Sequence, residues 1–219
     1  RGGSRMSFRK ETLAEGIELY NADCREVLPT LGKVDAVVTD PPYGIGIAAN
    51  PFRQKHEKKT WDDVVADLSF IPLADCPSIV WGGNYFGLPA SQGFYIWDKV
   101  QPESFSSAQV EYAWSSMAKP AKLFRRHVVS FEKHHPTTKP LELMEWCIQQ
   151  LPVDSTIVLD PFMGSGTTGV ACVKLGRKFI GIEIEPKYFD IACKRISEAL
   201  KQPDFFVEKP KPAKQEALI

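Results

Sequence analysis

A glycine-rich turn most narrows the folds that are open to this chain of 219 residues. The turn directly follows residues 155–160, an apolar run that predicts a buried strand ending at Asp160. A helical pattern begins just after it, at about residues 167–175. The glycines that give the spacing G-x-G-x-x-G are Gly164, Gly166 and Gly169. Because such glycines let the backbone approach a ligand at a helix start, the turn predicts a cofactor site in an α/β fold.

An acidic residue ends the next predicted strand, at residues 178–183. Glu183 is placed there to accept hydrogen bonds from two ribose hydroxyls of a nucleotide cofactor. A P-loop is excluded because no Lys-Ser or Lys-Thr pair follows the glycines. NAD and S-adenosylmethionine both present an adenosine ribose, so these residues alone leave the cofactor open.

A second short apolar run, residues 34–38, also leads to an acid. The corner that follows consists of Asp40, Pro41, Pro42 and Tyr43. Ligands collect at the carboxyl ends of strands in open α/β sheets. The two prolines fix φ and remove two N–H donors, which leaves backbone carbonyls as acceptors beside a carboxylate and a flat ring. The pattern favours a reactive corner that grips an amino group on a planar ring, with a plain proline turn as the alternative.

The hydrophobic periods predict the remaining elements. Strands are expected at residues 16–20, 78–81, 93–98, 110–114 and 127–131, and helices at residues 25–31, 140–151 and 186–200. The later strands are expected to be antiparallel edge pieces, with Val110, Tyr112 and Trp114 alternating along a half-exposed one. The opening β-α-β unit brings Asp23 and Asp40 to the same edge of the sheet.

Length and a hydrophobic content of 43% predict one domain, at about residues 6–201. Residues 1–5 resemble a cloning remnant before Met6, and the Pro- and Lys-rich residues 202–219 predict a disordered tail. No apolar run approaches the length of a membrane span, so we expect a soluble, cytoplasmic protein. Five scattered cysteines argue against a disulfide framework and against a zinc site, and we expect no metal.

Two basic segments are candidates for contact with a polyanion, although the formal net charge is zero. The run at residues 53–59 lies in a predicted mobile loop, residues 44–60, and is either a solvated surface or a phosphate-contacting arm. The stronger cluster consists of Lys119, Lys122, Arg125, Arg126, Lys133 and Lys139, with Glu132 as the only acid in that span.

The two acid-ended motifs together resemble a known family. The segment Asp160-Pro-Phe-Met-Gly-Ser-Gly-Thr-Thr168 and the corner Asp40-Pro-Pro-Tyr43 resemble the paired signature of the DNA methyltransferases that make N6-methyladenine or N4-methylcytosine. The catalytic motif comes first here, and His135-Pro-Thr-Thr-Lys-Pro140 leads into the helix before the cofactor motif. This order resembles the β class, whose members are of phage or restriction-modification type, and the resemblance covers about residues 16–200.

The resemblance implies a Rossmann-like fold dependent on S-adenosylmethionine, with a circularly permuted motif order and a mostly parallel central sheet flanked by helices. It implies cofactor contacts by Asp23, Cys24, Thr138, Lys139, Pro140, Asp160, Phe162, Gly164, Ser165, Gly166, Thr167 and Glu183. Among these, Asp23 and Cys24 match an adenine-contacting turn, and residues 138–140 match the segment that closes over the methionine moiety. Glu185 is a rival for Glu183. Target recognition is expected in residues 82–135, assisted by residues 44–60.

The implied reaction needs the target base to leave the duplex. Asp40 and the Pro41 carbonyl would then accept hydrogen bonds from the exocyclic amine while Tyr43 stacks on the ring. The aspartate at the motif's first position favours N6-methyladenine, and N4-methylcytosine is the alternative. A NAD-dependent oxidoreductase and an inactive nucleic-acid-binding relative are the alternatives of other classes. DNA is the expected partner, and a homodimer is one of the oligomeric states that the sequence leaves open.

Overall fold

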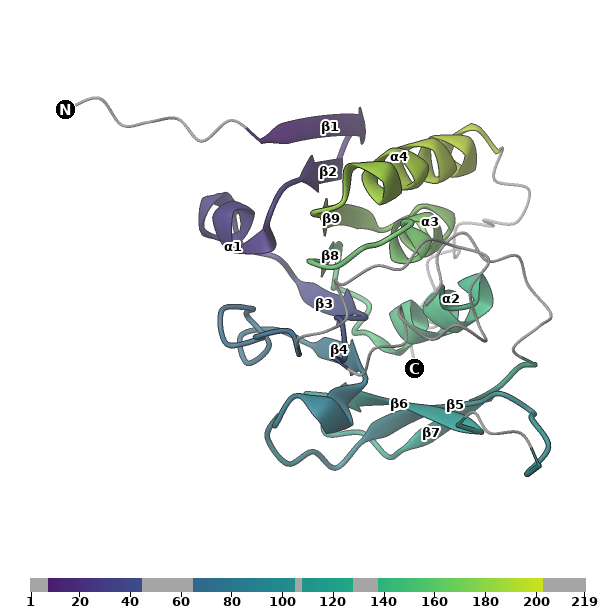
Figure 1. Cartoon of the computed structure of the whole chain (residues 1–219). Helices are drawn as coiled ribbons and strands as arrows, with labels where there is room; N and C mark the ends of the chain where they lie inside the picture. Colours follow the sequence, from purple (N-terminus) through teal and green to yellow (C-terminus); the bar gives the residue numbers. More distant parts are fainter. Residues whose placement is uncertain (1–7, 45–64, 105–107, 128–137, 203–219) are drawn as a thin grey trace, which may run out of the picture.

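The computed structural model describes residues 8–44, 65–104, 108–127 and 138–202. Its strands are β1 (Arg9–Ala14), β2 (Ile17–Asn21), β3 (Ala36–Thr39), β4 (Ser78–Trp81), β5 (Phe94–Asp98), β6 (Val110–Ser115), β7 (Lys122–Arg125), β8 (Ile157–Asp160) and β9 (Lys178–Glu183). They form one sheet in the order β1-β2-β9-β8-β3-β4-β6-β5-β7 (Figure 1). The pairs from β2 to β4 are parallel, and antiparallel pairs join β1 to β2, β4 to β6 and β6 to β5. The central sheet is therefore mostly parallel, as predicted.

Helices cover both faces of the central strands (Figure 1). The helices are α1 (Cys24–Val27), α2 (Leu141–Gln150), α3 (Thr167–Lys174) and α4 (Pro186–Lys201), with short 3₁₀ helices η1 (Leu28–Thr30) and η3 (Gly83–Tyr85). The three longer helices lie on one face, and α1 lies on the other. No helix in the described ranges is long and apolar enough to cross a membrane.

The central strands are apolar throughout because both of their faces are covered. Successive side chains point to opposite faces, so Val38 belongs to the cluster beneath α2, α3 and α4, whereas Val37 belongs to the cluster beneath α1. The same alternation separates Ile79 from Val80 in β4. Burial on both faces fixes the position of each strand along its own axis. It therefore also fixes the position of the acids at the strand ends.

The structure corrects several element predictions. The sheet gains β1, an antiparallel edge strand that the periodicity did not predict. The predicted helix at residues 25–31 is divided into α1 and η1, because Pro29 enters at the start of the 3₁₀ turn. The predicted strand at residues 127–131 lies, apart from His127, outside the described residues.

The strands beyond β4 in the sheet, which are β6, β5 and β7, differ most from the predictions. Strands β5 and β6 pair antiparallel, as expected for the later strands, whereas β7, which the sequence did not predict, pairs in parallel with β5. In β6 the predicted alternation does not identify the core side. Ala113 is fully buried and Tyr112 is 44% exposed, and the side chain of Glu111 lies on the same face of the strand as that of Ala113.

Candidate active site

One cavity of about 410 Å³ opens at the carboxyl ends of β2, β9, β8 and β3. Two predicted site residues, Pro140 and Gly166, do not line it. The predicted residues that do are Asp23, Cys24, Asp40, Pro41, Pro42, Tyr43, Thr138, Lys139, Asp160, Phe162, Gly164, Ser165, Thr167 and Glu183. The fold therefore brings two motifs that are far apart in the sequence into the lining of one cavity.

Asp160 holds the glycine turn against the neighbouring strand. Its Oδ1 accepts hydrogen bonds from the Thr39 hydroxyl at 2.8 Å and from the backbone N–H of Phe162 at 3.1 Å. Its Oδ2 accepts one from the Thr168 hydroxyl at 2.6 Å. Burial raises the pKa of Asp160 to about 6, although these hydrogen bonds oppose the rise. Both carboxylate oxygens are thus already used to tie β8 to β3 and to the start of α3.

Gly166 serves helix packing. It is the residue before α3, with φ of 79°, and a Cβ added there would lie 2.8 Å from the Cβ of Ala192 in α4. A side chain would therefore force α3 and α4 apart. Pro140 stands at the corresponding position before α2, where its carbonyl accepts from the Met144 N–H at 3.2 Å.

Glu183 closes the cofactor side of the cavity at the end of β9. Its Oε2 accepts from the Gly164 N–H at 2.9 Å, and its Oε1 accepts from the Glu185 N–H at 2.8 Å. Burial raises the pKa of Glu183 to about 7 against these two hydrogen bonds. Glu185 also lines the cavity, so the predicted rivalry between the two acids remains a matter for mutation.

The turn after β2 presents a capping acid and a buried thiol. The Asp23 carboxylate caps α1 by accepting from the Arg25 N–H at 2.9 Å, and it also pairs with the Arg25 guanidinium. Burial raises the pKa of the Cys24 thiol to about 11, so it stays neutral at physiological pH. This turn therefore offers the cavity a fixed carboxylate and an apolar sulfur.

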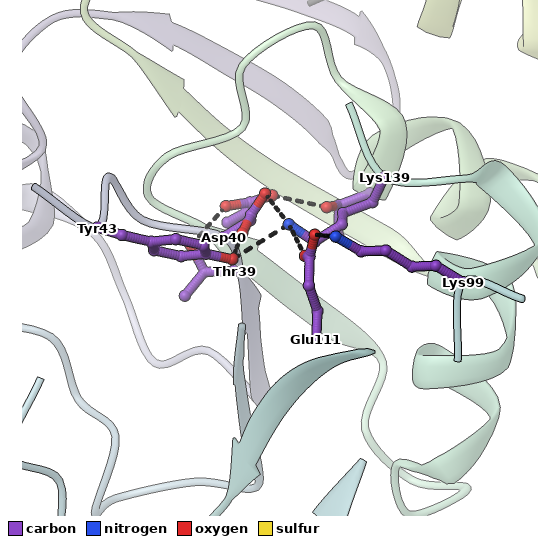
Figure 2. A network of polar contacts seen from close by, with 8 residues as sticks. Thr39, Asp40, Tyr43, Lys99, Glu111 and Lys139 are labelled. Atoms are coloured by element: carbon purple, nitrogen blue, oxygen red, sulfur yellow. Dashed lines mark hydrogen bonds and ion pairs between the residues drawn. The ribbon is translucent and has the colours of Figure 1, made fainter. Parts of the chain in front are cut away.

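On the other side of the cavity, the Asp40 carboxylate has two partners (Figure 2). Its Oδ1 accepts from the Tyr43 hydroxyl at 2.5 Å, and its Oδ2 accepts from Lys139 Nζ at 2.6 Å. Burial raises the pKa of Asp40, and the Lys139 charge opposes that rise. Here the carboxylate and the aromatic ring of the predicted reactive corner are joined in one hydrogen-bonded unit.

The ring of Tyr43 is packed into place by residues that the sequence did not single out. It stacks on Tyr85 with ring centroids 5.1 Å apart, and Phe86 meets it edge-on at 6.1 Å. Gly82, at φ of 68°, lets the ring approach its backbone, because an added Cβ would lie 2.2 Å from Tyr43 Cε1. The turn that follows β4 thus has a specific purpose, which is to seat this ring.

Lys139 belongs to the Asp40 side of the site. The sequence placed it both in the basic cluster and among residues near the methionine moiety, yet its side chain is only 6% exposed. Besides Asp40, it pairs with Glu111 of β6 at 3.1 Å, and Glu111 pairs in turn with Lys99 at 2.6 Å (Figure 2). Its inclusion in a surface patch was wrong, because both of its partners lie in the interior.

Glu111 and Lys99 were missed, although a signal for them exists. Lys99 continues the inward alternation of Tyr95 and Trp97, so a charge there falls on a core-facing position. Glu111 is the register partner of Trp97, and it therefore points to the same face. A charged residue in phase with buried aromatics on a strand is the feature that would have identified both.

The four other described residues of the basic cluster form two pairs, which lie near opposite ends of the strands. Arg125 pairs with Asp98 at 2.8 Å and Arg126 with Glu142 at 2.8 Å, at the edge that carries the cavity. The two lysines, Lys119 and Lys122, bind Gln150 at the opposite edge, through its backbone carbonyl at 2.7 Å and its side-chain oxygen at 2.6 Å. One continuous patch is therefore not formed by these four residues.

Several predicted segments lie outside the described residues. These are the loop at residues 44–60 after Gly44, the segment 135–137 before Thr138, the tail after Gln202, and Lys133. The described part of the predicted target-recognition segment consists of η3 and the strands β5, β6 and β7.

Comparison with known proteins identifies the family. The model of the DNA methylase family matches residues 77–194, which is more than half of the chain, and the chain belongs to this family. The type II methyltransferase M2.LlaDCHI of Lactococcus lactis subsp. cremoris is 50% identical over 64 residues, which are 29% of this chain and 24% of the relative. M2.DpnII of Streptococcus pneumoniae is 52% identical over 62 residues, 28% of this chain and 23% of the relative. The chain thus spans about a quarter of the length of these curated relatives.

Solved structures share the fold over most of the chain. The crystal structure of the M1.HpyAVI–SAM complex is 28% identical, with a TM-score of 0.55, and the match covers 81% of this chain and 98% of that one. The cytosine-N4-specific PvuII DNA methyltransferase is 19% identical with a TM-score of 0.56, covering 81% and 85% of the two chains, and its likeness concerns the fold alone. These likenesses confirm the predicted methyltransferase fold.

Proposed function

We propose that this protein transfers a methyl group from S-adenosylmethionine to the exocyclic N6 of adenine in DNA, after the base has been flipped out of the helix. The observation that carries the proposal is that one cavity is lined by both the Asp40 corner and Glu183. One side offers acceptors for an amine on a planar ring, and the other offers the glycine turn and an acid. A transfer between two bound molecules needs both sides in one space.

The cofactor side suits S-adenosylmethionine. Its cavity lies within the usual size of small-molecule sites, about 300–1,000 Å³. Among the described residues, the carboxylates of Asp160 and Glu183 accept hydrogen bonds from hydroxyl and N–H groups and form no ion pair with a cation. Buried carboxylates without a countercharge favour a ligand that is itself cationic. S-adenosylmethionine supplies a sulfonium-bound methyl group, and the electron pair of the broken carbon–sulfur bond stays on sulfur.

The proposal also gives roles to residues around that cofactor. Glu183 would accept hydrogen bonds from the ribose hydroxyls, Asp23 and Cys24 would border the adenine, and the turn from Phe162 to Thr167 would hold the methionine part. NAD shares the ribose and remains the competing ligand of another class. The Asp40 corner favours S-adenosylmethionine, because a hydride transfer from or to NAD would leave the residues of this corner without a role.

The base side acts on the amine. Asp40 Oδ1 and the Pro41 carbonyl accept its hydrogen bonds, which turns the nitrogen lone pair toward the methyl group. To do so, Oδ1 exchanges the hydroxyl of Tyr43 for the amine, while that hydroxyl keeps its contact with Lys139 Nζ at 3.2 Å and the ring of Tyr43 stacks on the base. Once the nitrogen has bonded to the methyl carbon, it releases one proton, for which Asp40 Oδ1 is the nearest acceptor.

Adenine is proposed over cytosine because the corner begins with aspartate, as in the adenine enzymes that the sequence resembles. N4 of cytosine is the second candidate, since it offers the same acceptors an exocyclic amine. For contact with DNA, Arg125 and Arg126 lie at the edge of the sheet that carries the cavity. We also propose a cytoplasmic location and, for the oligomeric state, a homodimer.

The test is to incubate DNA with the protein and isotope-labelled S-adenosylmethionine, and then to identify labelled nucleosides by mass spectrometry. The expected product is N6-methyladenine, with Asp40→Ala as the inactive control. Labelled N4-methylcytosine alone would overturn the choice of base. Folded protein that labels no nucleoside, and that binds NAD in place of S-adenosylmethionine by calorimetry, would overturn the proposed function.

A further inference from the structure

Four side chains of alternating charge form a chain that ends at the reactive corner (Figure 2). Lys99 Nζ lies 2.6 Å from Glu111 Oε1, and Glu111 Oε2 lies 3.1 Å from Lys139 Nζ. Lys139 Nζ then lies 2.6 Å from Asp40 Oδ2. Lys99 directly follows β5 and Glu111 lies in β6, whereas the last two residues line the cavity. This row of charges therefore connects the region beside β5 and β6 to the carboxylate that we propose to be catalytic.

This arrangement is costly if its only purpose is to hold the fold. The side chains of Lys99 and Lys139 are 9% and 6% exposed, and that of Glu111 is 25% exposed. Removing charges from water costs several kcal/mol per ion, and well-packed apolar residues in place of a buried pair are often neutral or stabilising. The neighbours of these charges are apolar strands, so apolar side chains would fit the sheet. The charges therefore point to a function.

The backbone beside Lys99 supports the same conclusion. Val100 has φ of 52°, a left-handed conformation that is unfavourable for a β-branched residue. The turn is held by Asp98, whose Oδ1 accepts from the Val100 N–H at 2.8 Å. It directs the chain outward immediately after Lys99, whose ammonium stays inside, 5.5 Å from the ring of Trp97. Strain of this kind persists where the surrounding structure holds it, and it concentrates at functional sites.

We propose that Glu111 and Lys99 are positioning residues, which hold the ammonium of Lys139 against Asp40 so that this carboxylate stays ionised and faces the cavity. The inference rests on the proposed function, because it concerns how Asp40 is prepared to accept an amine. Lys139 supplies the countercharge, Glu111 fixes where that charge lies, and Lys99 compensates the charge of Glu111. Together with Asp40 the four charges sum to zero.

The charges around Asp40 explain why such a device is useful. Asp40 is faced by Lys139, by the Tyr43 hydroxyl, and by the carboxylates of Glu111 and Asp160. Burial and these carboxylates favour the protonated form, which is a weaker hydrogen-bond acceptor for an amine and cannot take up the proton that the amine releases. Lys139 is the cation that opposes them. Burial acts to lower the pKa of Lys139 itself, but the charges of Asp40 and Glu111 raise it above its ordinary value.

The test uses Glu111→Gln, which keeps the shape of the side chain and removes its charge. With one of its two carboxylates gone, Lys139 has a lower pKa, so its ammonium is lost at a lower pH as the pH rises. In protein labelled with ¹³C-lysine, NMR titration is expected to show this lower pKa, with Lys139→Arg identifying the signal. The alkaline limb of kcat moves to lower pH, and kcat falls about ten- to a hundredfold, the scale of a small misplacement in an active site.

Glu145→Gln is the matched control, because Glu145 also pairs with a lysine, Lys174, and lies outside the cavity. It is expected to leave the kcat profile unchanged. KM for S-adenosylmethionine is expected to stay within about twofold in Glu111→Gln, since the substitution acts through Asp40. A Lys139 pKa and a kcat profile equal to those of the unaltered protein would overturn the inference.

A second variant decides the matter if Glu111→Gln does not fold. Lys99→Met leaves the Glu111 charge uncompensated near Asp40, so the acid limb of kcat is expected to move to higher pH. An unmoved acid limb in this folded variant would overturn the inference. Failure of the proposed function and failure of the positioning network give different results. Absence of methyl transfer by the unaltered protein refutes the proposed function itself. An active parent with unaffected variants refutes the positioning network alone.

Discussion

The two sides of the cavity satisfy their buried carboxylates in opposite ways. On the cofactor side, Glu183 and Asp160 accept hydrogen bonds from N–H and hydroxyl groups, and burial raises their pKa values to about 7 and about 6. On the base side, Asp40 and Glu111 share the ammonium group of Lys139; burial still raises the pKa of Asp40, whereas the pKa of Glu111 falls to about 2. Burial alone would raise the pKa of Glu111, but the charges of Lys139 and Lys99 outweigh it.

The difference follows from what each side is proposed to hold. A cationic ligand can compensate carboxylates that the protein leaves without a countercharge, so the cofactor side is completed by binding. A neutral base brings no charge, so the protein itself must keep the accepting carboxylate ionised. The glycine turn therefore needs only backbone and hydroxyl donors, whereas the Asp40 corner needs a lysine and a network that holds it.

The largest expected effect belongs to Asp40, because its substitution removes the acceptor without touching the cofactor side. Asp40→Ala is expected to lower kcat by at least about 10²–10³-fold, the scale for losing one well-placed polar group at the reacting centre. Calorimetric affinity for S-adenosylmethionine is expected to change little. Turnover close to that of the parent protein would contradict the role of Asp40 as the acceptor for the amine.

The next effect tests the cofactor side. Glu183→Ala is expected to weaken binding of S-adenosylmethionine by about 1.5–3 kcal/mol, the range for hydrogen bonds to a charged group. Glu185→Ala is the matched control, because Glu185 lines the same cavity and stands only two residues further on. If Glu185→Ala gives the larger loss by calorimetry, the ribose is held by Glu185 and the assignment shifts by two residues.

A smaller effect follows from the pKa of Glu183. Because burial raises this pKa to about 7, the carboxyl is neutral below that pH and ionised above it. Ribose hydroxyls bind the ionised form better, so affinity for S-adenosylmethionine is expected to rise as pH increases through about 7. The gain is about 1 kcal/mol, or roughly fivefold, the difference between hydrogen bonds to charged and neutral acceptors. Calorimetry across pH 6–8 measures it, and in Glu183→Gln the rise should vanish.

How much could be predicted from sequence also differs between the two sides. The glycine turn, Asp160 and Glu183 follow one another along the chain as strand, turn, helix and strand, so local periodicity was enough to find them. The corner at residues 40–43 was equally local. Glu111 and Lys99 reach Asp40 only because β6 and β5 join the sheet next to β4, and pairing of that kind is not encoded in a short window.

The basic cluster shows the same limit from the other direction. Neighbouring positions in the sequence suggested one patch. Strand β7, however, runs parallel to β5, so its first residue lies at the end of the sheet opposite the cavity and its last residue at the same end as the cavity. Lys122 begins the strand and Arg125 ends it. The pairing with β5 could not be read from charge spacing, and it separates residues that the sequence had grouped.

The smallest expected effect concerns this division and DNA. Arg125→Ala with Arg126→Ala removes two cations at the edge with the cavity, and DNA binding is expected to weaken by about 0.5–1 kcal/mol, since each arginine is already paired with a carboxylate. Lys119→Ala with Lys122→Ala changes the same net charge at the far edge and is expected to leave DNA affinity and its salt dependence unchanged. It should lower thermal stability slightly, because Lys119 binds the last carbonyl of α2, a contact worth about 0.3–1 kcal/mol. Equal losses of DNA affinity in the two double variants, measured by fluorescence anisotropy at several salt concentrations, would show that the four residues act as one diffuse patch after all.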